Sequence, residues 1–262
     1  VPGLPPVVEL ALGGYHSCAR TGDDEIFCWG RNSAGQLGLG SMGDPRATPQ
    51  LVASFAGATS VAAGGFHACV AASGELHCWG RNVEGQIGNG SAGGNVDSPF
   101  LVPGLPAIAA ATGGDWHTCA LGDDGRAYCW GRNIQGQVGN GGVGETEAVP
   151  GAVVGLVDAI ALVAADDHTC AIDGSRGLWC WGDNLRGQVG DGVAGGERTF
   201  AVGVSGVPRL VDVAGGRRHS CGLGEAGEVL CWGQNVYGEL GDGTTDDRAV
   251  PGPTIFDCSP AE

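Results

Sequence analysis

The chain has 262 residues, of which 52 are glycine, and its 29 acidic and 13 basic residues give a formal net charge of −16. This charge, and the lack of a basic stripe, argue against a nucleic-acid partner. The apolar runs are much shorter than the roughly 20 residues that a transmembrane helix needs, so we expect no membrane span. The first residue is Val1 and no signal-peptide pattern follows it, so we interpret the chain as a mature or trimmed form.

A repeat organises the whole chain. Histidines recur at intervals of 50 or 51 residues, each followed by a Cys-Trp-Gly triplet; the five are His16, His67, His117, His168 and His219. A period near 50 is typical of propellers and solenoids, whose units bury their apolar faces only against neighbours. We therefore predict a single domain over residues 1–262. Its repeats span approximately 1–51, 52–102, 103–152, 153–203 and 204–255, followed by a C-terminal tail at 256–262.

Each repeat contains four short apolar segments separated by turn-forming residues. In the second repeat these segments are, in chain order, 60–63, 67–71, 75–79 and 99–102. Glycine pairs or Ser-Gly turns separate the first three, and a long Gly/Asn-rich loop precedes the fourth. Four short antiparallel strands per unit are typical of a propeller blade. The sequence therefore predicts an all-β fold, a β-propeller of five four-stranded blades.

Ten of the 11 cysteines occur as one pair per repeat, on adjacent strands joined by a tight turn that places them opposite one another. We predict one disulfide per blade: Cys18–Cys28, Cys69–Cys78, Cys119–Cys129, Cys170–Cys180 and Cys221–Cys231. Such pairing indicates an oxidising location, either extracellular, at the cell surface or periplasmic. Zinc is the alternative, but no fourth ligand recurs, so we expect neither metal nor cofactor. Cys258 is left over and is expected to be free, intermolecular or part of a linker.

Several repeated side chains are interpreted as scaffold. The tryptophan of each triplet should fill the space between blades, and each repeat histidine should tie its blade to the neighbour's backbone through a ring nitrogen. The repeated glutamines, replaced by Glu239 in the last repeat, should satisfy backbone groups of their loops. Positive φ is expected at two positions of each loop: the asparagines 32, 82, 133, 184 and 235, and the glycines 35, 85, 136, 187 and 238.

The motifs Gly-x-x-His-x-Cys-Ala-Leu and Cys-Trp-Gly-x-Asn-x-x-Gly-Gln-Leu-Gly, with a later Pro-x-x-Val, resemble the repeat of the regulator of chromosome condensation family. The resemblance is closest to the Cys-paired bacterial branch and covers essentially the whole chain. It implies a propeller that acts through protein–protein contacts, since members include a nucleotide-exchange factor for a small GTPase and inhibitors of β-lactamases. Most members have seven blades rather than five, and the acidic, Cys-paired composition does not suit a chromatin-bound exchange factor.

The two ends of the chain bear on ring closure. Val1-Pro2-Gly3-Leu4-Pro5 matches residues 102–106, and Val250-Pro251-Gly252-Pro253 matches the same point of the repeat. The chain thus begins and ends at one phase of the repeat. We predict a closed five-bladed ring whose terminal segments meet; the alternative is an open arc or a piece of a longer propeller.

Candidate binding residues lie where the repeats differ, because repeated positions are committed to folding. The pair before each repeat histidine changes from Gly14-Tyr15, Gly65-Phe66 and Asp115-Trp116 to Asp166-Asp167 and Arg217-Arg218. Aromatic residues and arginine are enriched at binding hot spots, and the resemblance to propeller-type β-lactamase inhibitors places interface aromatics directly before the histidine. We therefore predict a partner-binding face formed by Tyr15, Phe66, Trp116, Asp166, Asp167, Arg217 and Arg218. Alternatively, the aromatics cover the channel mouth and the charged residues pair across adjacent blades.

The preferred function is a non-enzymatic extracytoplasmic module that binds a protein of unknown identity. A lectin would repeat its binding residues in every blade, which the pairs before the histidines do not. An enzyme would need a nucleophile and base, but Ser17 and His16 are adjacent on a strand and point to opposite faces. A structural surface or adhesion element is a further alternative. The Asp/Gly-rich loops show no regular calcium-ligand register.

Overall fold

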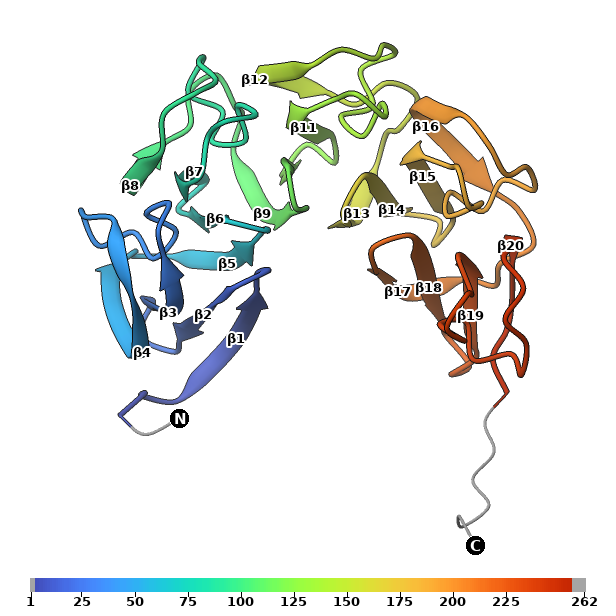
Figure 1. The fold of residues 1–262 in the computed structure, drawn as a ribbon, viewed down its shortest axis with the longest axis horizontal. Helices are drawn as coiled ribbons and strands as arrows, with labels where there is room; N and C mark the ends of the chain where they lie inside the picture. The colour runs from blue at the N-terminus through green and yellow to red at the C-terminus, as the bar shows by residue number, and fades with distance from the viewer. Residues whose placement is uncertain (1–2, 256–262) are drawn as a thin grey trace, which may run out of the picture.

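The computed structural model describes residues 3–255, which form twenty β-strands and contain no helix (Figure 1). Four consecutive strands make each of five separate antiparallel sheets. The prediction of an all-β propeller with five four-stranded blades is therefore confirmed. Because residues 3–255 are strands and loops, they contain no helix that could cross a bilayer. The predicted tail at 256–262, with Cys258, lies outside the described residues.

The strand bounds follow the repeat. Blade 1 has β1 (Val7–Leu12), β2 (His16–Thr21), β3 (Glu25–Asn32) and β4 (Gly43–Ser54). Blade 2 has β5 (Ala58–Ala63), β6 (His67–Ala72), β7 (Glu75–Gly80) and β8 (Val96–Leu101). Blade 3 has β9 (Ile108–Gly113), β10 (His117–Gly122), β11 (Ala127–Arg132) and β12 (Thr146–Ala152). Blade 4 has β13 (Ala159–Ala164), β14 (His168–Asp173), β15 (Leu178–Asp183) and β16 (Glu197–Val204). Blade 5 has β17 (Leu210–Gly215), β18 (His219–Gly224), β19 (Val229–Gly233) and β20 (Arg248–Pro253).

The Cys-Trp dipeptide of each third strand contributes one side chain to each face of its blade. Successive side chains of a strand point to opposite faces, so the cysteine lies on one face and the tryptophan on the other. In blade 3, Cys129 lies directly opposite Cys119 and forms the predicted disulfide, with a Cα–Cα distance of 4.1 Å. This disulfide packs toward blade 4, in the same cluster as Trp181. Trp130 packs toward blade 2. The other four predicted disulfides form in the same way.

Apolar side chains are buried between blades rather than at the centre of the molecule. Four clusters fill the four spaces between consecutive blades. In each cluster, the tryptophan of the later blade is fully buried. Its Nε1 donates to the backbone carbonyl of the loop glutamine in the preceding blade, as Trp130 does to Gln86 at 2.9 Å. A Cβ at Gly88 would lie 2.7 Å from the same Nε1, so glycine is required there. The tryptophans therefore fill the space between blades, as predicted.

Three of the five repeat histidines contact a neighbour's hydroxyl rather than its backbone. His67 Nε2 lies 2.9 Å from Thr118 Oγ1 in the next blade, and that hydroxyl donates to the Gln86 carbonyl. The same chain of contacts joins His117 to Thr169 and His168 to Ser220. The expectation of a backbone partner was wrong because the hydroxyl, itself fixed by the loop carbonyl, comes between the ring and the backbone.

Each loop is ordered by an asparagine side chain, and the expectation of positive φ at the asparagines was wrong. Positive φ occurs at the five loop glycines, including Gly85 at 74°, but at none of these asparagines. Asn82 Oδ1 instead accepts from the Ile87 amide and its Nδ2 donates to the Ser91 carbonyl. Gln86 Oε1 accepts from the Glu84 amide, so the glutamines satisfy loop amides as expected.

The five blades form an open arc, and the prediction of a closed five-bladed ring was wrong. Blades 1 and 5 stand at the two ends of the arc, with a gap between them (Figure 1). The chain ends do share one phase of the repeat, but closure depends on the angle between neighbouring blades, and this angle is too small for five blades to complete a circle. Within residues 3–255 no blade covers the outer face of blade 1, so Trp29 is only partly buried, while Leu10 and Leu12 are 62% and 75% exposed.

Candidate functional site

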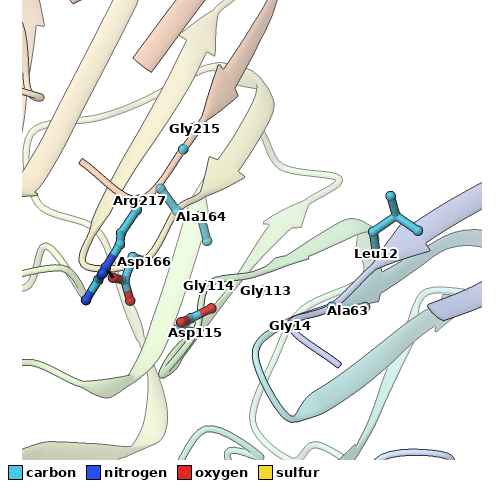
Figure 2. Close-up of a pocket in the computed structure, with 14 residues that line it drawn as sticks. Leu12, Gly14, Ala63, Gly113, Gly114, Asp115, Ala164, Asp166, Gly215 and Arg217 are labelled. Carbon is cyan, nitrogen blue, oxygen red and sulfur yellow. Dashed lines mark hydrogen bonds and ion pairs between the residues drawn. The ribbon is translucent and has the colours of Figure 1, made fainter. Parts of the chain in front are cut away.

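The loops between the first and second strands of the blades line the inner side of the arc. Their glycine backbones surround a cavity of about 380 Å³, which Asp115, Asp166 and Arg217 border on one side and Leu12 on the other (Figure 2). Arg217 Nε donates to Asp166 Oδ2 at 3.2 Å, so these residues of blades 5 and 4 pair across adjacent blades. The first residue of the predicted pair therefore lines this inner cavity in four of the five blades, as Gly14, Asp115, Asp166 and Arg217.

The residues directly before the histidines of blades 1 to 3 are aromatic and lie one beside the next. The Tyr15 and Phe66 rings have centroids 5.1 Å apart and are tilted by 34°. Tyr15 is 61% exposed, and Phe66 and Trp116 are half-buried. The geometry therefore brings together the three aromatic residues that the sequence singled out.

Three arginines alternate with these rings. The Arg31 guanidinium carbon lies 5.4 Å from the Tyr15 centroid and 5.3 Å from that of Phe66. The Arg81 carbon lies 5.7 Å from the Phe66 ring and 4.6 Å from the Trp116 ring. Such distances are within the range of cation–π attraction. The aromatic–arginine ladder is the continuous set Tyr15, Arg31, Phe66, Arg81, Trp116 and Arg132.

The sequence analysis missed the arginines of the ladder. They follow the Trp-Gly of blades 1 to 3, inside a motif that we interpreted as scaffold. A signal was present, because the same position holds Asp183 in blade 4 and Gln234 in blade 5. The residue after Trp-Gly therefore changes from arginine to aspartate between blades 3 and 4. The residue before the histidine changes from aromatic to acidic between the same two blades.

At blade 4 the ladder meets a carboxylate cluster, formed by Asp115, Asp166 and Asp167. Asp167 occupies the position of the aromatics in blades 1 to 3 and accepts from Arg132 Nη1 at 3.4 Å and from Gln137 Nε2 at 2.9 Å. Loss of solvation, followed by repulsion from Asp166, raises the pKa of Asp167 to about 6 despite the attraction of Arg132. Loss of solvation and then Asp166 also raise the pKa of Asp115.

Arg218 is half-buried on blade 5, and within residues 3–255 no carboxylate lies close enough to form an ion pair with it. The candidate residues thus divide between two places. Tyr15, Phe66, Trp116 and Asp167 form one row with the ladder arginines, whereas Asp166 and Arg217 pair at the inner cavity. The part of the chain that the structure describes contains no group of three or more His, Cys, Asp or Glu residues arranged to hold a metal ion.

The buried histidines are scaffold groups held neutral. Burial lowers the pKa of His67, His117 and His168 to about 3 and that of His16 to about 4. Because the Ser220 hydroxyl donates to the Gln188 carbonyl, His168 must donate its Nε2 proton to Ser220 Oγ. A ring that donates to the hydroxyl is unable to remove its proton.

Comparison with known proteins identifies the family of this propeller fold. The chain matches the WD40_RLD family, described as RCC1-like domain, over residues 1–261. It is 32% identical over 254 residues to the human probable E3 ubiquitin-protein ligase HERC4, covering 94% of this chain and 19% of that protein. It is 31% identical over 272 residues to the mitochondrial RCC1 domain-containing protein RUG3 of Arabidopsis thaliana, covering 96% and 48%. The chain therefore spans from about a fifth to about half the length of these relatives.

Solved structures agree on the fold. Yeast RCC1 (Prp20), in a complex with Kap60, superimposes with a TM-score of 0.86 at 22% identity, covering 97% of this chain and 62% of that one. Human WBSCR16 superimposes with a TM-score of 0.84 at 22% identity, covering 98% and 69%. At this level of identity the likeness shows the fold alone.

Proposed function

Because the chain belongs to the RCC1-like domain family, we propose that it is a non-enzymatic, extracytoplasmic module that binds a protein partner through the aromatic–arginine ladder. Propellers of this family commonly mediate protein interaction. Yeast Prp20 is bound to Kap60 in one solved structure, and binding to Gsp1p and histones is described for the same protein in another. The single observation that carries the proposal is the row of three rings interleaved with three guanidinium groups across blades 1 to 3.

The composition of the ladder supports a protein partner. Tryptophan, tyrosine and arginine are the residue types most enriched at binding hot spots. The cation–π contacts limit the rotation of each side chain before a partner arrives, which reduces the entropy lost on binding. The residues of the ladder also differ from the corresponding residues of blades 4 and 5, so this face has one composite site rather than the one equivalent site per blade of a lectin.

Two further observations support the other parts of the proposal. Five disulfides, one in each blade, favour an oxidising compartment, which is extracellular, at the cell surface or periplasmic. The buried His–hydroxyl pairs have their hydroxyl protons committed to loop carbonyls, which supports a role in folding rather than catalysis.

The test is affinity capture of proteins from the envelope and surroundings of the source organism. Three baits are compared: the native chain, a triple variant and a matched control. The triple variant combines Tyr15→Ala, Phe66→Ala and Trp116→Ala, and the control is Tyr237→Ala. Tyr237 is 89% exposed but lies outside the ladder. We expect a protein that the native chain and the control retain and the triple variant loses. Equal capture by all three baits, or none by any, would show that the ladder is not the binding site.

A further inference from the structure

We propose that the ladder receives an extended acidic segment of the partner, whose carboxylates bind Arg31 and Arg81. This inference rests on the proposed function and adds the chemistry of the partner. The observation behind it is that the first two guanidinium groups of the ladder are held in place by rings but lack an anionic partner within residues 3–255.

The distribution of ion pairs singles out these two arginines. Acidic residues outnumber arginines by 29 to 13, so most arginines find a carboxylate within the chain. Among residues 3–255, eight do so within 4.0 Å: Arg20, Arg126, Arg132, Arg186, Arg198, Arg209, Arg217 and Arg248. Of the remaining five, Arg31 and Arg81 belong to the ladder. Their availability in so acidic a chain points to an anion that comes from outside it.

The third step of the ladder already contains the contact that we propose for the first two. Each ladder arginine faces the residue before the histidine of the following blade, which is Phe66 for Arg31 and Trp116 for Arg81. For Arg132 that residue is Asp167, whose carboxylate accepts from Nη1 at 3.4 Å. A carboxylate of the partner bound to Arg31 or Arg81 would therefore make the same kind of contact that Asp167 makes with Arg132 inside this chain.

The cation–π contacts leave the terminal nitrogens of Arg31 and Arg81 free for such a contact. A guanidinium group stacks through its flat faces and donates hydrogen bonds from its edge. Arg31 Nε donates to Ser33 Oγ at 2.8 Å, which fixes the group from one side. Neither Arg31 nor Arg81 has a hydrogen-bonded terminal nitrogen among the contacts of the described residues, and Arg81 Nε is buried without an acceptor. Carboxylates accept bidentate hydrogen bonds from this edge.

The spacing fits one extended segment. The Arg31 and Arg81 guanidinium carbons lie 5.3 and 5.7 Å from the same Phe66 centroid, so they are at most about 11 Å apart. An extended chain advances roughly 3.3–3.6 Å per residue. Acidic residues two positions apart in the partner, whose side chains lie on one face of an extended chain, would therefore reach both arginines.

Single-stranded nucleic acid is the competing anion, and the geometry disfavours it. Bases would have to stack on ring faces, but the Phe66 and Trp116 rings are each flanked by two guanidinium groups. The carboxylate cluster at the end of the ladder would also repel a continuous phosphate backbone. A peptide can instead place its acidic residues over blades 1 and 2 only.

The test measures direct binding of fluorescent peptides to the full, disulfide-bonded chain by anisotropy. The probes are a polyglutamate of about ten residues, a polylysine of equal length and an oligothymidylate, each at about 50 mM and about 200 mM salt. The variants are Arg31→Gln, Arg81→Gln and their combination. Arg46→Gln is the matched control, because Arg46 is exposed on β4, has no carboxylate partner among residues 3–255 and lies outside the ladder.

We expect saturable polyglutamate binding that the double variant weakens by about tenfold or more and that Arg46→Gln leaves unchanged. The inference is overturned if polyglutamate does not saturate by about 1 mM, if Arg46→Gln weakens binding equally, or if oligothymidylate or polylysine binds more tightly in an arginine-dependent way. A captured protein that needs the three aromatics but not Arg31 and Arg81 would preserve the proposed function and overturn this inference alone.

Discussion

At the scale of single residues, the copies of the repeat act as natural variants of one another. In blades 3, 4 and 5 a buried hydroxyl contacts the histidine of the preceding blade; the three residues are Thr118, Thr169 and Ser220. Blade 2 has Ala68 at this position, and both ring nitrogens of His16 are buried without a hydrogen-bond partner among residues 3–255. A buried polar group without a partner costs about 1–3 kcal/mol.

Ala68→Ser should therefore stabilise the protein by about 1 kcal/mol, because the new hydroxyl can accept from His16 and donate to the Gln36 carbonyl. The measurement is chemical denaturation at neutral pH with the disulfides intact. Thr118→Val is the reciprocal change and should destabilise by about 1–3 kcal/mol. A loss of stability in Ala68→Ser would mean that the space beside His16 is too small for an oxygen atom.

At the scale of the blade, stability depends on interfaces between sheets. Each inner blade has two such faces, one built around its tryptophan and the other around its disulfide, while blades 1 and 5 each leave one face open. Trp79, Trp130, Trp181 and Trp232 are fully buried, whereas Trp29 at the open face of blade 1 is only partly buried. The cost of removing a tryptophan should follow this difference in burial.

Trp130→Ala should destabilise the chain by about 3–5 kcal/mol, since it removes a fully buried indole and the bond from Nε1 to the Gln86 carbonyl. Trp29→Ala should cost less, about 1–2 kcal/mol, because its ring is only partly buried. The two variants are compared by urea denaturation, with circular dichroism to confirm native β-structure. Equal losses would indicate that the face of blade 1 is covered in solution.

At the scale of the whole molecule, the four buried neutral histidines of blades 1 to 4 make stability depend on pH. Their folded pKa values, about 3 or about 4, lie below the ordinary 6.5. The unfolded chain therefore binds more protons, so the histidine contribution is complete above pH 6.5 and is lost as the pH falls toward 3. Asp167 acts in the opposite sense, because its raised pKa of about 6 favours its protonated form in the native state.

We expect the free energy of unfolding to decrease between pH 7 and pH 4, by at most about 1.4 kcal/mol per pH unit for each buried histidine. Asp167→Asn should make this decrease steeper, because it removes a group whose protonation favours the native state. The carboxylates of Asp173 and Asp191 contribute little in this range: burial opposes the shift, but their hydrogen bonds outweigh it and lower both pKa values, so their effect is lost only at more acidic pH. Denaturation curves across this range, with the disulfides intact, measure the slope; a flat profile in the native chain would contradict the expectation.

The sequence by itself determined the blade. Strand pairing, the turn between Cys119 and Cys129, and the opposite orientation of Cys129 and Trp130 all depend on residues close together in one repeat, and five copies in phase leave little ambiguity. The aromatic residues of the ladder were also predictable, because they stand at the position where the repeats diverge most clearly.

The tertiary structure decided the arc and the arginines of the ladder. Whether the ring closes depends on a small angle between blades that adds up over every interface, and matching chain ends do not report that angle. Arg81 contacts Trp116, in the next blade, only because the two sheets pack side by side. A contact between blades depends on the packing of whole sheets, so it could not be read from a single repeat.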